Sequence, residues 1–325
     1  MFTLAHFSDP HLALRQSPAW HQLLNKRITG YVNLRRNRNH SHQDWALELL
    51  LQDMRTRKPD HIALTGDLVN LSLPSEFTRT RAWLNKIGRA DQVSVIPGNH
   101  DAYVRLAENQ GIAQWADYMT GDLGDRAASS GIPVFPYLRV RGDVGILGIS
   151  SAVATGPFMA TGKIGRTQLA AAERILISMK EQNLFRVILV HHPLIPDQVK
   201  RYKRLLDGDK LLALIARTGA DLILHGHSHS DTLAWCLTPT GRAPIIGVPS
   251  ASSIDESDRI PAQYNLYGIA RNDAAWRIDM VSRRLKPKIK LFKTIRRINL
   301  VPGSGDLNVS IGEQDGDTGD HSENE

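Results

Sequence analysis

The stretch VSVIPGNHD, residues 93–101, is the part of the sequence that says most about the fold. Its apolar first half predicts a buried strand, and its polar second half places Asn99, His100 and Asp101 directly at the end of that strand. The same arrangement, a short apolar run that ends in a polar cluster, occurs at other places along the chain. The other clusters are DPH at residues 9–11, GD at 66–67, HHP at 191–193 and GHSH at 226–229.

Strands and helices alternate around these clusters. Short buried strands are predicted over 3–8, 61–65, 93–96, 134–140, 145–149, 186–190 and 221–224, and shorter β segments over 231–236, 244–248, 264–270 and 275–281. Amphipathic helices are predicted over 42–57, 75–87, 166–181 and 210–217. Sites in open α/β sheets form beyond the carboxyl ends of strands, so these distant loops are expected to converge. The layout predicts stacked sheets with helices outside, in a single domain over residues 1–300.

Taken singly, most of the clusters have an ordinary explanation as turns. GHSH is harder to explain as core packing, because His227 and His229 alternate out of a strand end. Taken together, carboxylate and amide oxygens mixed with imidazole nitrogens suit Mn, Fe or Zn better than Ca²⁺ or thiolate-bound zinc. Two such ions need ligands from several loops and a carboxylate that bridges them.

In this order the five clusters resemble the motifs of the calcineurin-like metallophosphoesterase superfamily, D-x-H, GD, GNH[DE], H-x-P-like and GHxH, over about residues 3–230. The resemblance implies an α/β fold, a four-layer α/β/β/α sandwich with the site at the strand C-termini. It also implies two divalent or mixed-valence metal ions. The ligands that it implies are Asp9, His11 and His229 for one ion, Asn99, His191 and His227 for the other, and Asp67 as the bridge between them.

The reaction implied by the resemblance is in-line attack on phosphorus by a hydroxide that bridges the two metals. Asn99 would neutralise charge on the phosphoryl group. His100 would face the leaving oxygen, either as a proton donor or as a cationic hydrogen-bond donor. Asp101 would orient the His100 ring and raise its pKa. An alternative for Asp101 is the N-cap of a helix over 102–115. His192 is interpreted as a supporting or packing residue beside the ligand His191.

The resemblance also bears on the substrate. GDLVN at residues 66–70, together with GNHD, looks most like bacterial cyclic-nucleotide-type phosphodiesterases, which favours a small phosphodiester. Phosphoprotein phosphatases carry GDxVDRG instead, and cytosolic UDP-2,3-diacylglucosamine pyrophosphatases typically carry Arg at the position of His100. The double-strand-break nucleases share GNHD, so the alternative is a phosphoesterase or pyrophosphatase acting on lipid-linked or nucleic-acid phosphate. A non-catalytic scaffold is the least favoured hypothesis, because no ligand residue is missing.

The net charge of +7 gathers in two places. The first is a basic insert over 15–40, without acidic residues, which is interpreted as a substrate lid or a solvated helix. Its arginines are predicted to bind substrate: Arg35, Arg36 and Arg38. The second is the segment 282–300, whose run 286–293 is predicted to form an edge strand, with a nucleic-acid contact or a membrane patch as alternatives. Residues 303–325 predict an acidic, disordered tail.

Other features of the sequence bear on the compartment. No run approaches the length of a membrane span, the first residues do not resemble a secretory signal, and Cys236 is the only cysteine. We therefore expect a cytoplasmic protein, with peripheral membrane contact through its basic surface. The expected partner is a small phosphodiester or a phosphorylated lipid or nucleotide. Nucleic acid is not favoured, and no oligomeric state is predicted.

Overall fold

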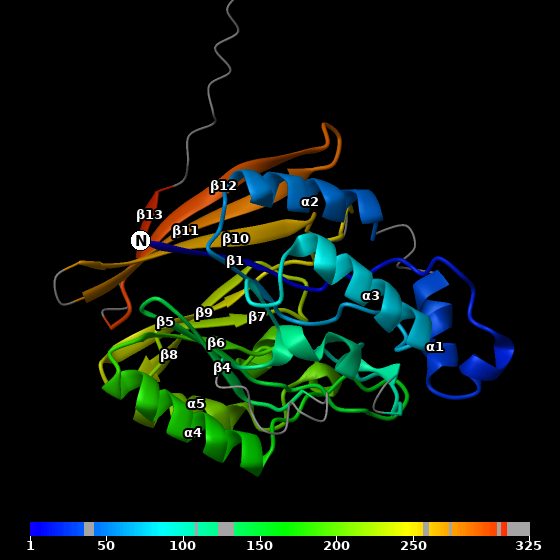
Figure 1. Ribbon diagram of the computed structural model, residues 1–325, viewed down its shortest axis with the longest axis horizontal. Coiled ribbons are helices and arrows are strands. Elements are labelled where there is room, and N and C mark those ends of the chain that lie inside the picture. The colour runs from blue at the N-terminus through cyan, green and yellow to red at the C-terminus, as the bar shows by residue number, and fades with distance from the viewer. Residues whose placement is uncertain are drawn as a thin grey trace, which may run out of the picture.

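The computed structural model describes residues 1–35, 42–107, 110–122, 133–255, 260–272, 275–303 and 307–310 (Figure 1). In this part of the chain, two sheets lie face to face. One has the strand order β13-β12-β11-β10-β1-β2-β3, and the other has the order β4-β5-β6-β7-β9-β8. Each sheet is mixed, with β1, β2 and β3 parallel in the first and β5, β6, β7 and β9 parallel in the second.

The strands β1 to β11 lie at the predicted places, whereas β12 and β13 do not match any predicted strand. The first sheet contains β1 (Phe2–Phe7), β2 (His61–Leu64), β3 (Val93–Val95), β10 (Gln263–Asn272), β11 (Ala275–Lys286), β12 (Leu291–Leu300) and β13 (Leu307–Ser310). The second contains β4 (Tyr137–Arg141), β5 (Val144–Gly148), β6 (Phe185–Leu189), β7 (Leu222–His225), β8 (Thr232–Thr238) and β9 (Gly241–Gly247). Parallel strands carry their carboxyl ends to one edge of a sheet, which is where the polar clusters follow them.

The helices cover the outer faces of the two sheets. The α-helices are α1 (Arg27–Asn33), α2 (Asp44–Thr56), α3 (Pro74–Ile87), α4 (Arg166–Glu181) and α5 (Gly208–Thr218). Short 3₁₀ helices are η1 (Trp20–Leu23), η4 (Ile112–Met119), η6 (Pro196–Gln198) and η7 (Arg201–Lys203). Among the described residues, no helix combines the length and the apolar character that crossing a membrane requires.

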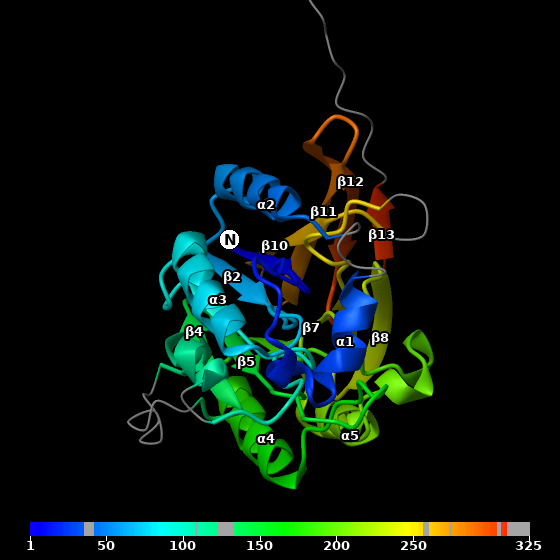
Figure 2. The same cartoon turned by 90° about the vertical axis from the view of Figure 1, so that its right-hand side faces the viewer.

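Two apolar clusters hold the layers together. The larger one joins the two sheets, with Leu4 of β1 and Val187 of β6 both fully buried in it. The smaller one lies between the second sheet and α4 and α5. Ala172, Leu176 and Met179 repeat along the buried side of α4 at the spacing of an amphipathic helix. The two sheets thus lie between one layer of helices above and another below (Figures 1 and 2). This arrangement confirms the predicted α/β/β/α sandwich.

Near the C-terminus the structure corrects two predictions. The basic run 286–293 is the end of β11, a turn and the start of β12, so it forms a hairpin rather than an edge strand. Four residues of the predicted disordered tail, Leu307–Ser310, form β13 and pair with β12. The alternation of basic and apolar residues predicted a strand but could not locate the turn at Pro287–Lys290. Residues 311–325 of that tail lie outside the described residues.

Candidate metal centre

Five loops meet at the shared edge of the two sheets. They follow β1, β2, β3, β6 and β7, and each begins within a few residues of the strand end. The loops are tied to one another by backbone and side-chain bonds. Asp9 N donates to Gly66 O, Gly226 N donates to His191 O, and His191 Nδ1 lies 2.6 Å from Thr65 O across the two sheets. All seven predicted metal ligands are therefore brought into one region.

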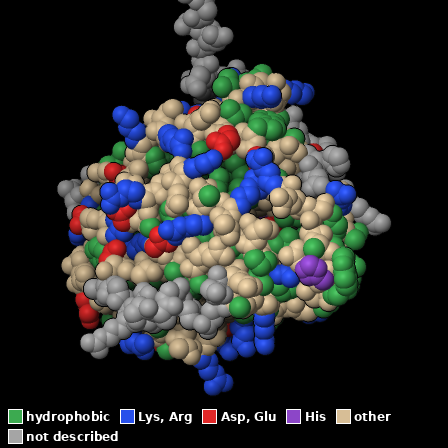
Figure 3. All heavy atoms as spheres, turned by 45° about the vertical axis from the view of Figure 1, so that its right-hand side comes forward, with side chains coloured by type: hydrophobic (Ala, Val, Ile, Leu, Met, Phe, Trp, Pro, Cys, Tyr) green, Lys and Arg blue, Asp and Glu red, His purple; other side chains and the backbone are tan. Residues whose placement is uncertain are grey.

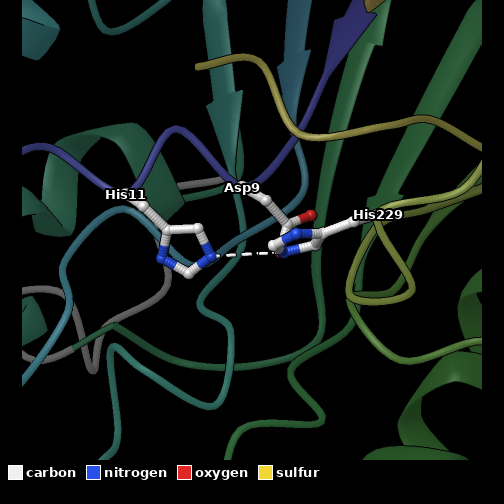
Figure 4. A group of neighbouring side chains, drawn as sticks. All are labelled: Asp9, His11 and His229. Carbon is white, nitrogen blue, oxygen red and sulfur yellow. Dashed lines mark hydrogen bonds and ion pairs between the residues drawn. The ribbon is translucent and has the colours of Figure 1, made fainter. Parts of the chain in front are cut away.

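The first group consists of Asp9, His11 and His229, which point toward one another (Figure 4). Asp9 and His11 come from the loop after β1, and His229 comes from the loop after β7. His229 Nε2 lies 3.2 Å from Asp9 Oδ1 and 3.3 Å from His11 Nε2. Ligand atoms about 2.1 Å from one cation lie roughly 3.0–3.4 Å apart when they are neighbours around it. Both distances fall in that range, and the third pair, His11 Nε2 and Asp9 Oδ1, is somewhat wider at 3.9 Å. The three ligand atoms are thus close enough together to hold one ion.

The second group consists of Asp67, His191 and His227, all buried. Asn99 joins it, because its Oδ1 lies 3.3 Å from His191 Nε2. The Asp67 carboxylate lies between the groups. Its Oδ1 is 3.4 Å from His191 Nε2, whereas its Oδ2 is 3.8 Å from His11 Nε2. One carboxylate thus faces both candidate metal sites, as a bridging ligand requires.

The hydrogen bonds around the ligands leave the metal-facing atoms available. His191 Nδ1 donates to the Thr65 carbonyl, and His11 Nδ1 lies 3.4 Å from the Val69 carbonyl. A carbonyl can only accept, so the Nε2 atoms of these rings are the ones left to bind a cation. His227 Nε2 is buried without a hydrogen-bond partner, which is costly unless a cation completes the site. The residues present therefore fit two metal ions.

The backbone at the ligands is held in an unfavourable conformation. Asp9, His11, Asp67, His227 and His229 all have positive φ, between 40° and 64°. Side chains other than glycine adopt this left-handed region only when the surrounding structure imposes it. Five of the seven predicted ligands share this feature, which is consistent with backbone turns that aim side chains inward at the cost of local strain.

Two glycines allow the loops to approach each other closely. A Cβ on Gly98 would collide with Asp67 Oδ1, and a Cβ on Gly226 would collide with Ser8 Oγ and Asp9 Oδ2. No side chain can be added at either position without displacing a ligand carboxylate. Glycine is therefore required at these two positions because any larger residue would push a ligand carboxylate out of place.

Opposite charges stabilise each other within the site. Burial alone would raise the pKa of Asp67, but the charges of His191 and His100 outweigh it and hold that pKa well below its usual range. Burial would lower the pKa of His191, but Asp67 raises it to about 9. A buried carboxylate that remains ionised beside protonated imidazoles is suited to bind a metal cation, whose charge would replace that of the imidazole protons.

His100 lines the cleft above the ligands, but the groups that contact its ring do not include Asp101, the residue predicted to orient it. Its Nδ1 donates to the Asn70 carbonyl over 2.6 Å, and its ring stacks on Tyr103 with 5.3 Å between centroids. The Asp101 carboxylate accepts from the backbone N–H groups of Gly98, Leu68 and Val69.

Asp101 was predicted to orient His100, and the structure corrects this. Asn70 and Tyr103 position the ring, whereas Asp101 fastens the loop after β3 to the loop after β2. The alternative role as an N-cap is not supported either, because among the described residues 102–107 form a turn, bends and coil, and the 3₁₀ helix η4 begins only at Ile112.

Replacing Asp101 with alanine should therefore destabilise the loops. Three buried N–H groups would lose their acceptor, which should lower the free energy of unfolding by about 3 kcal/mol. Denaturant unfolding of the metal-loaded protein measures this. An unchanged unfolding midpoint, combined with a turnover loss that grows for poor leaving groups, would instead return Asp101 to a direct role at His100.

Two further histidines support the site. His192 Nδ1 bonds to Ser151 Oγ at 2.7 Å, and its ring lies 4.4 Å from that of His227. His42, which the sequence did not single out, packs edge-on against His11 at 5.3 Å between centroids and bonds to Ser252 Oγ. No motif near His42 predicts this supporting role, because its hydrogen-bond partner Ser252 lies 210 residues away in the chain.

A cleft of about 670 Å³ opens over the metal centre. Its walls include Asp67, Asn99, His100, His227 and His229. On one side they are completed by residues of the basic insert: Lys26, Thr29, Gly30, Asn33 and Leu34. The insert therefore lies beside the site, as the sequence suggested.

The arginines of the insert are placed differently from the prediction. Arg35 is exposed, packs over the Tyr31 ring and does not line the cleft, while Arg36 and Arg38 lie outside the described residues. Arg27 is buried and donates to the carbonyls of Leu71 and Ser72, so it anchors the insert. Among the described residues of the insert, Lys26 is the cation that lines the cleft, and the sequence did not distinguish it from its neighbours.

Comparison with known families agrees with this geometry. The sequence profile of the calcineurin-like phosphoesterases matches residues 2–231, which contain every predicted ligand. The chain belongs to that family. It is therefore a metal-dependent phosphoesterase with two candidate metal sites.

Individual relatives are more distant. A protein of a Synechococcus species, described as a probable cyclic nucleotide phosphodiesterase, is 25% identical over 228 residues, covering 69% of this chain and 77% of the relative. Among solved structures, a dimetal phosphatase from Danio rerio has a TM-score of 0.55 at 12% identity, covering 95% of this chain and 98% of that one. The purple acid phosphatase PPD1 from yellow lupin also reaches 0.55, at 13% identity, over 90% of this chain and 52% of that one. At these identities the two structures support the fold alone.

Proposed function

We propose that this phosphoesterase hydrolyses a small phosphodiester of the cyclic-nucleotide type, with two Mn, Fe or Zn ions in the candidate sites. The observation that carries the proposal is the position of Asp67, whose two carboxylate oxygens face the two ligand groups. When bound, two divalent ions supply the positive charge that acidifies water and neutralises the phosphoryl oxygens.

The protein groups around that centre have distinct tasks. Asp67 holds negative charge between the two ligand groups, and Asp9 holds it within the first group. The amide of Asn99 is placed beside the second group to contact a phosphoryl oxygen. His100 donates its Nδ1 proton to Asn70 O, and its ring forms part of the cleft wall. A protonated Nε2 is suited to give its proton to the leaving oxygen.

The shape and charge of the cleft support a small substrate. About 670 Å³ is within the usual size range of small-molecule sites. Lys26 and Lys203 contribute cationic groups to the walls, and Tyr103 and Tyr202 contribute aromatic rings. The Synechococcus relative supports the cyclic-nucleotide type of diester. A phosphate carried by a lipid is the second candidate, favoured by exposed apolar side chains near the cleft.

A comparison of diester with monoester tests the proposal. The protein loaded with Mn²⁺ should turn over bis-p-nitrophenyl phosphate at least about tenfold faster than p-nitrophenyl phosphate, and a chelator should abolish both activities. A panel of cyclic nucleotides, glycerophosphodiesters, nucleotide-linked lipids and single-stranded DNA then identifies the substrate. A preference for the monoester would contradict the proposed diester, while leaving the phosphoesterase assignment intact.

A further inference from the structure

Exposed apolar side chains concentrate near the mouth of the cleft. Among the described residues, fourteen large hydrophobic side chains are classed as exposed, and eight of them belong to three segments that reach the cleft. These eight are Trp20, Leu24, Ile28, Val32, Phe158, Met159, Tyr202 and Leu206. We call this set the rim. Trp20 and Leu24 are 75% and 73% exposed, although Trp and Leu side chains are mostly buried in folded proteins.

Hydrogen bonds join the three segments of the rim. Lys26 Nζ, between Leu24 and Ile28, donates to Met159 O at 2.8 Å and to Thr155 Oγ1 at 2.7 Å. Ala160 N donates to Tyr202 O at 2.8 Å. The apolar side chains are therefore neighbours on one part of the surface. When the side that carries α1 comes forward, hydrophobic side chains lie there next to lysines and arginines (Figure 3).

Phe158 is the most unusual member of the rim. It is 80% exposed and has a φ of 61°, a conformation that a bulky side chain rarely adopts. The backbone is therefore strained at a position where the side chain has little apolar contact to compensate. Such strain is typically retained where a side chain serves binding.

The charge around the rim is mainly positive. Lys26 and Lys203 line the cleft, and Arg201 and Lys200 are exposed beside Tyr202. No acidic residue occurs between Asp9 and Asp44. The exposed carboxylate of Asp197, near η7, lies 3.3 Å from Arg204 Nη2 and forms an ion pair with it. Apolar and aromatic side chains among cations are characteristic of surfaces that lie in the headgroup region of a bilayer.

We infer that the rim docks on an anionic lipid surface, so that the cleft opens toward the membrane. Trp20, Leu24 and Phe158 would enter the headgroup layer, while the exposed Lys200 and Arg201 would face lipid phosphates. A phosphoester carried on a lipid would then reach the metal centre without leaving the bilayer. Docking itself does not depend on which diester the centre hydrolyses.

Vesicle binding of the full chain tests this inference. We expect co-sedimentation with vesicles containing 40% phosphatidylglycerol, weak binding to pure phosphatidylcholine, and release in about 0.5 M NaCl because salt screens surface charge. The double variant W20S/L24S should lower the partition coefficient about tenfold or more, since two large apolar side chains are lost. It should retain wild-type turnover of bis-p-nitrophenyl phosphate, because neither residue lines the cleft. Phe158→Ser alone should also weaken vesicle binding.

The chain offers a matched control in the β11–β12 hairpin. Ile289 and Leu291 are 54% and 57% exposed among lysines, but this hairpin does not line the cleft. The variant I289S/L291S should bind vesicles as the wild type does. The inference is overturned if this variant loses binding instead, if W20S/L24S binds like the wild type, or if no anionic vesicle is bound. It is equally overturned if sedimentation velocity shows that W20S/L24S converts a dimer to a monomer, because the rim would then contact a second copy.

Discussion

Replacing Asp67 with alanine is expected to reduce diester hydrolysis by at least about 10³-fold and to prevent stable occupancy of the two metal sites. Asp67 is the carboxylate whose two oxygens face both ligand groups, at 3.4 Å and 3.8 Å from the nearest imidazole nitrogens. Without Asp67, two cations would repel each other with no negative charge between them, so they would bind weakly. Because the metals supply several kcal/mol of transition-state stabilisation, losing them would lower the rate by the stated factor. Elemental analysis of the purified variant and its turnover of bis-p-nitrophenyl phosphate measure both effects.

His192→Ala provides the matched control for that experiment. His192 is as buried as Asp67 and lies beside a ligand ring, but its nitrogens contact Ser151 Oγ and Ala160 O. At saturating Mn²⁺ it should keep two ions and most of its turnover, with a loss of metal affinity of about 10–100-fold, as for other supporting residues. An Asp67→Ala protein with two ions and near wild-type turnover would disprove the bridging role.

Replacing His100 with alanine should give a different result. His100 is not one of the predicted metal ligands, and its Nδ1 donates to the Asn70 carbonyl, so metal content should survive. Turnover should fall by roughly 10²–10⁴-fold, the usual loss for a general acid. The loss should be smallest for p-nitrophenolate and largest for an alkoxide leaving group, because a poor leaving group needs the proton most. Rates for a series of aryl and alkyl diesters measure this dependence.

Two controls make the His100 result specific. His21→Ala removes an exposed imidazole on the basic insert and should leave every rate unchanged. Tyr103→Phe keeps the stacked ring beside His100 and should retain most of the activity. Equal losses for good and poor leaving groups in His100→Ala would exclude proton donation and leave electrostatic contact with the phosphoryl group as its role.

The sequence by itself determined the sandwich fold and the positions of the ligand residues along it. Each cluster follows an apolar run directly, and the period of the apolar residues separates strands from helices. The carboxyl ends of parallel strands share an edge, so the clusters after β1, β2 and β3 had to meet. The ordered clusters also sufficed to predict the family, which the profile match over residues 2–231 confirmed.

Only the tertiary structure decided how the site is supported. Asp101 follows His100 in the chain, and adjacency suggested a pair. In the fold, however, the Asp101 carboxylate points to backbone groups of Gly98, Leu68 and Val69, and a carbonyl of Asn70 takes its place at His100. Backbone donors and acceptors carry no residue identity, so the sequence contains no signal for these bonds.

The same reasoning applies to the basic insert. Its composition identified a cationic segment near the metals, but the sequence could not tell the buried anchor Arg27 from Lys26 in the wall of the cleft or from the exposed Arg35. Those roles depend on which way a short helix is turned against Leu71, Ser72 and Tyr103. The sequence thus determined which chemistry is present, and contacts between distant segments decided which side chains face it, because packing orients a helix through partners that lie far away in the chain.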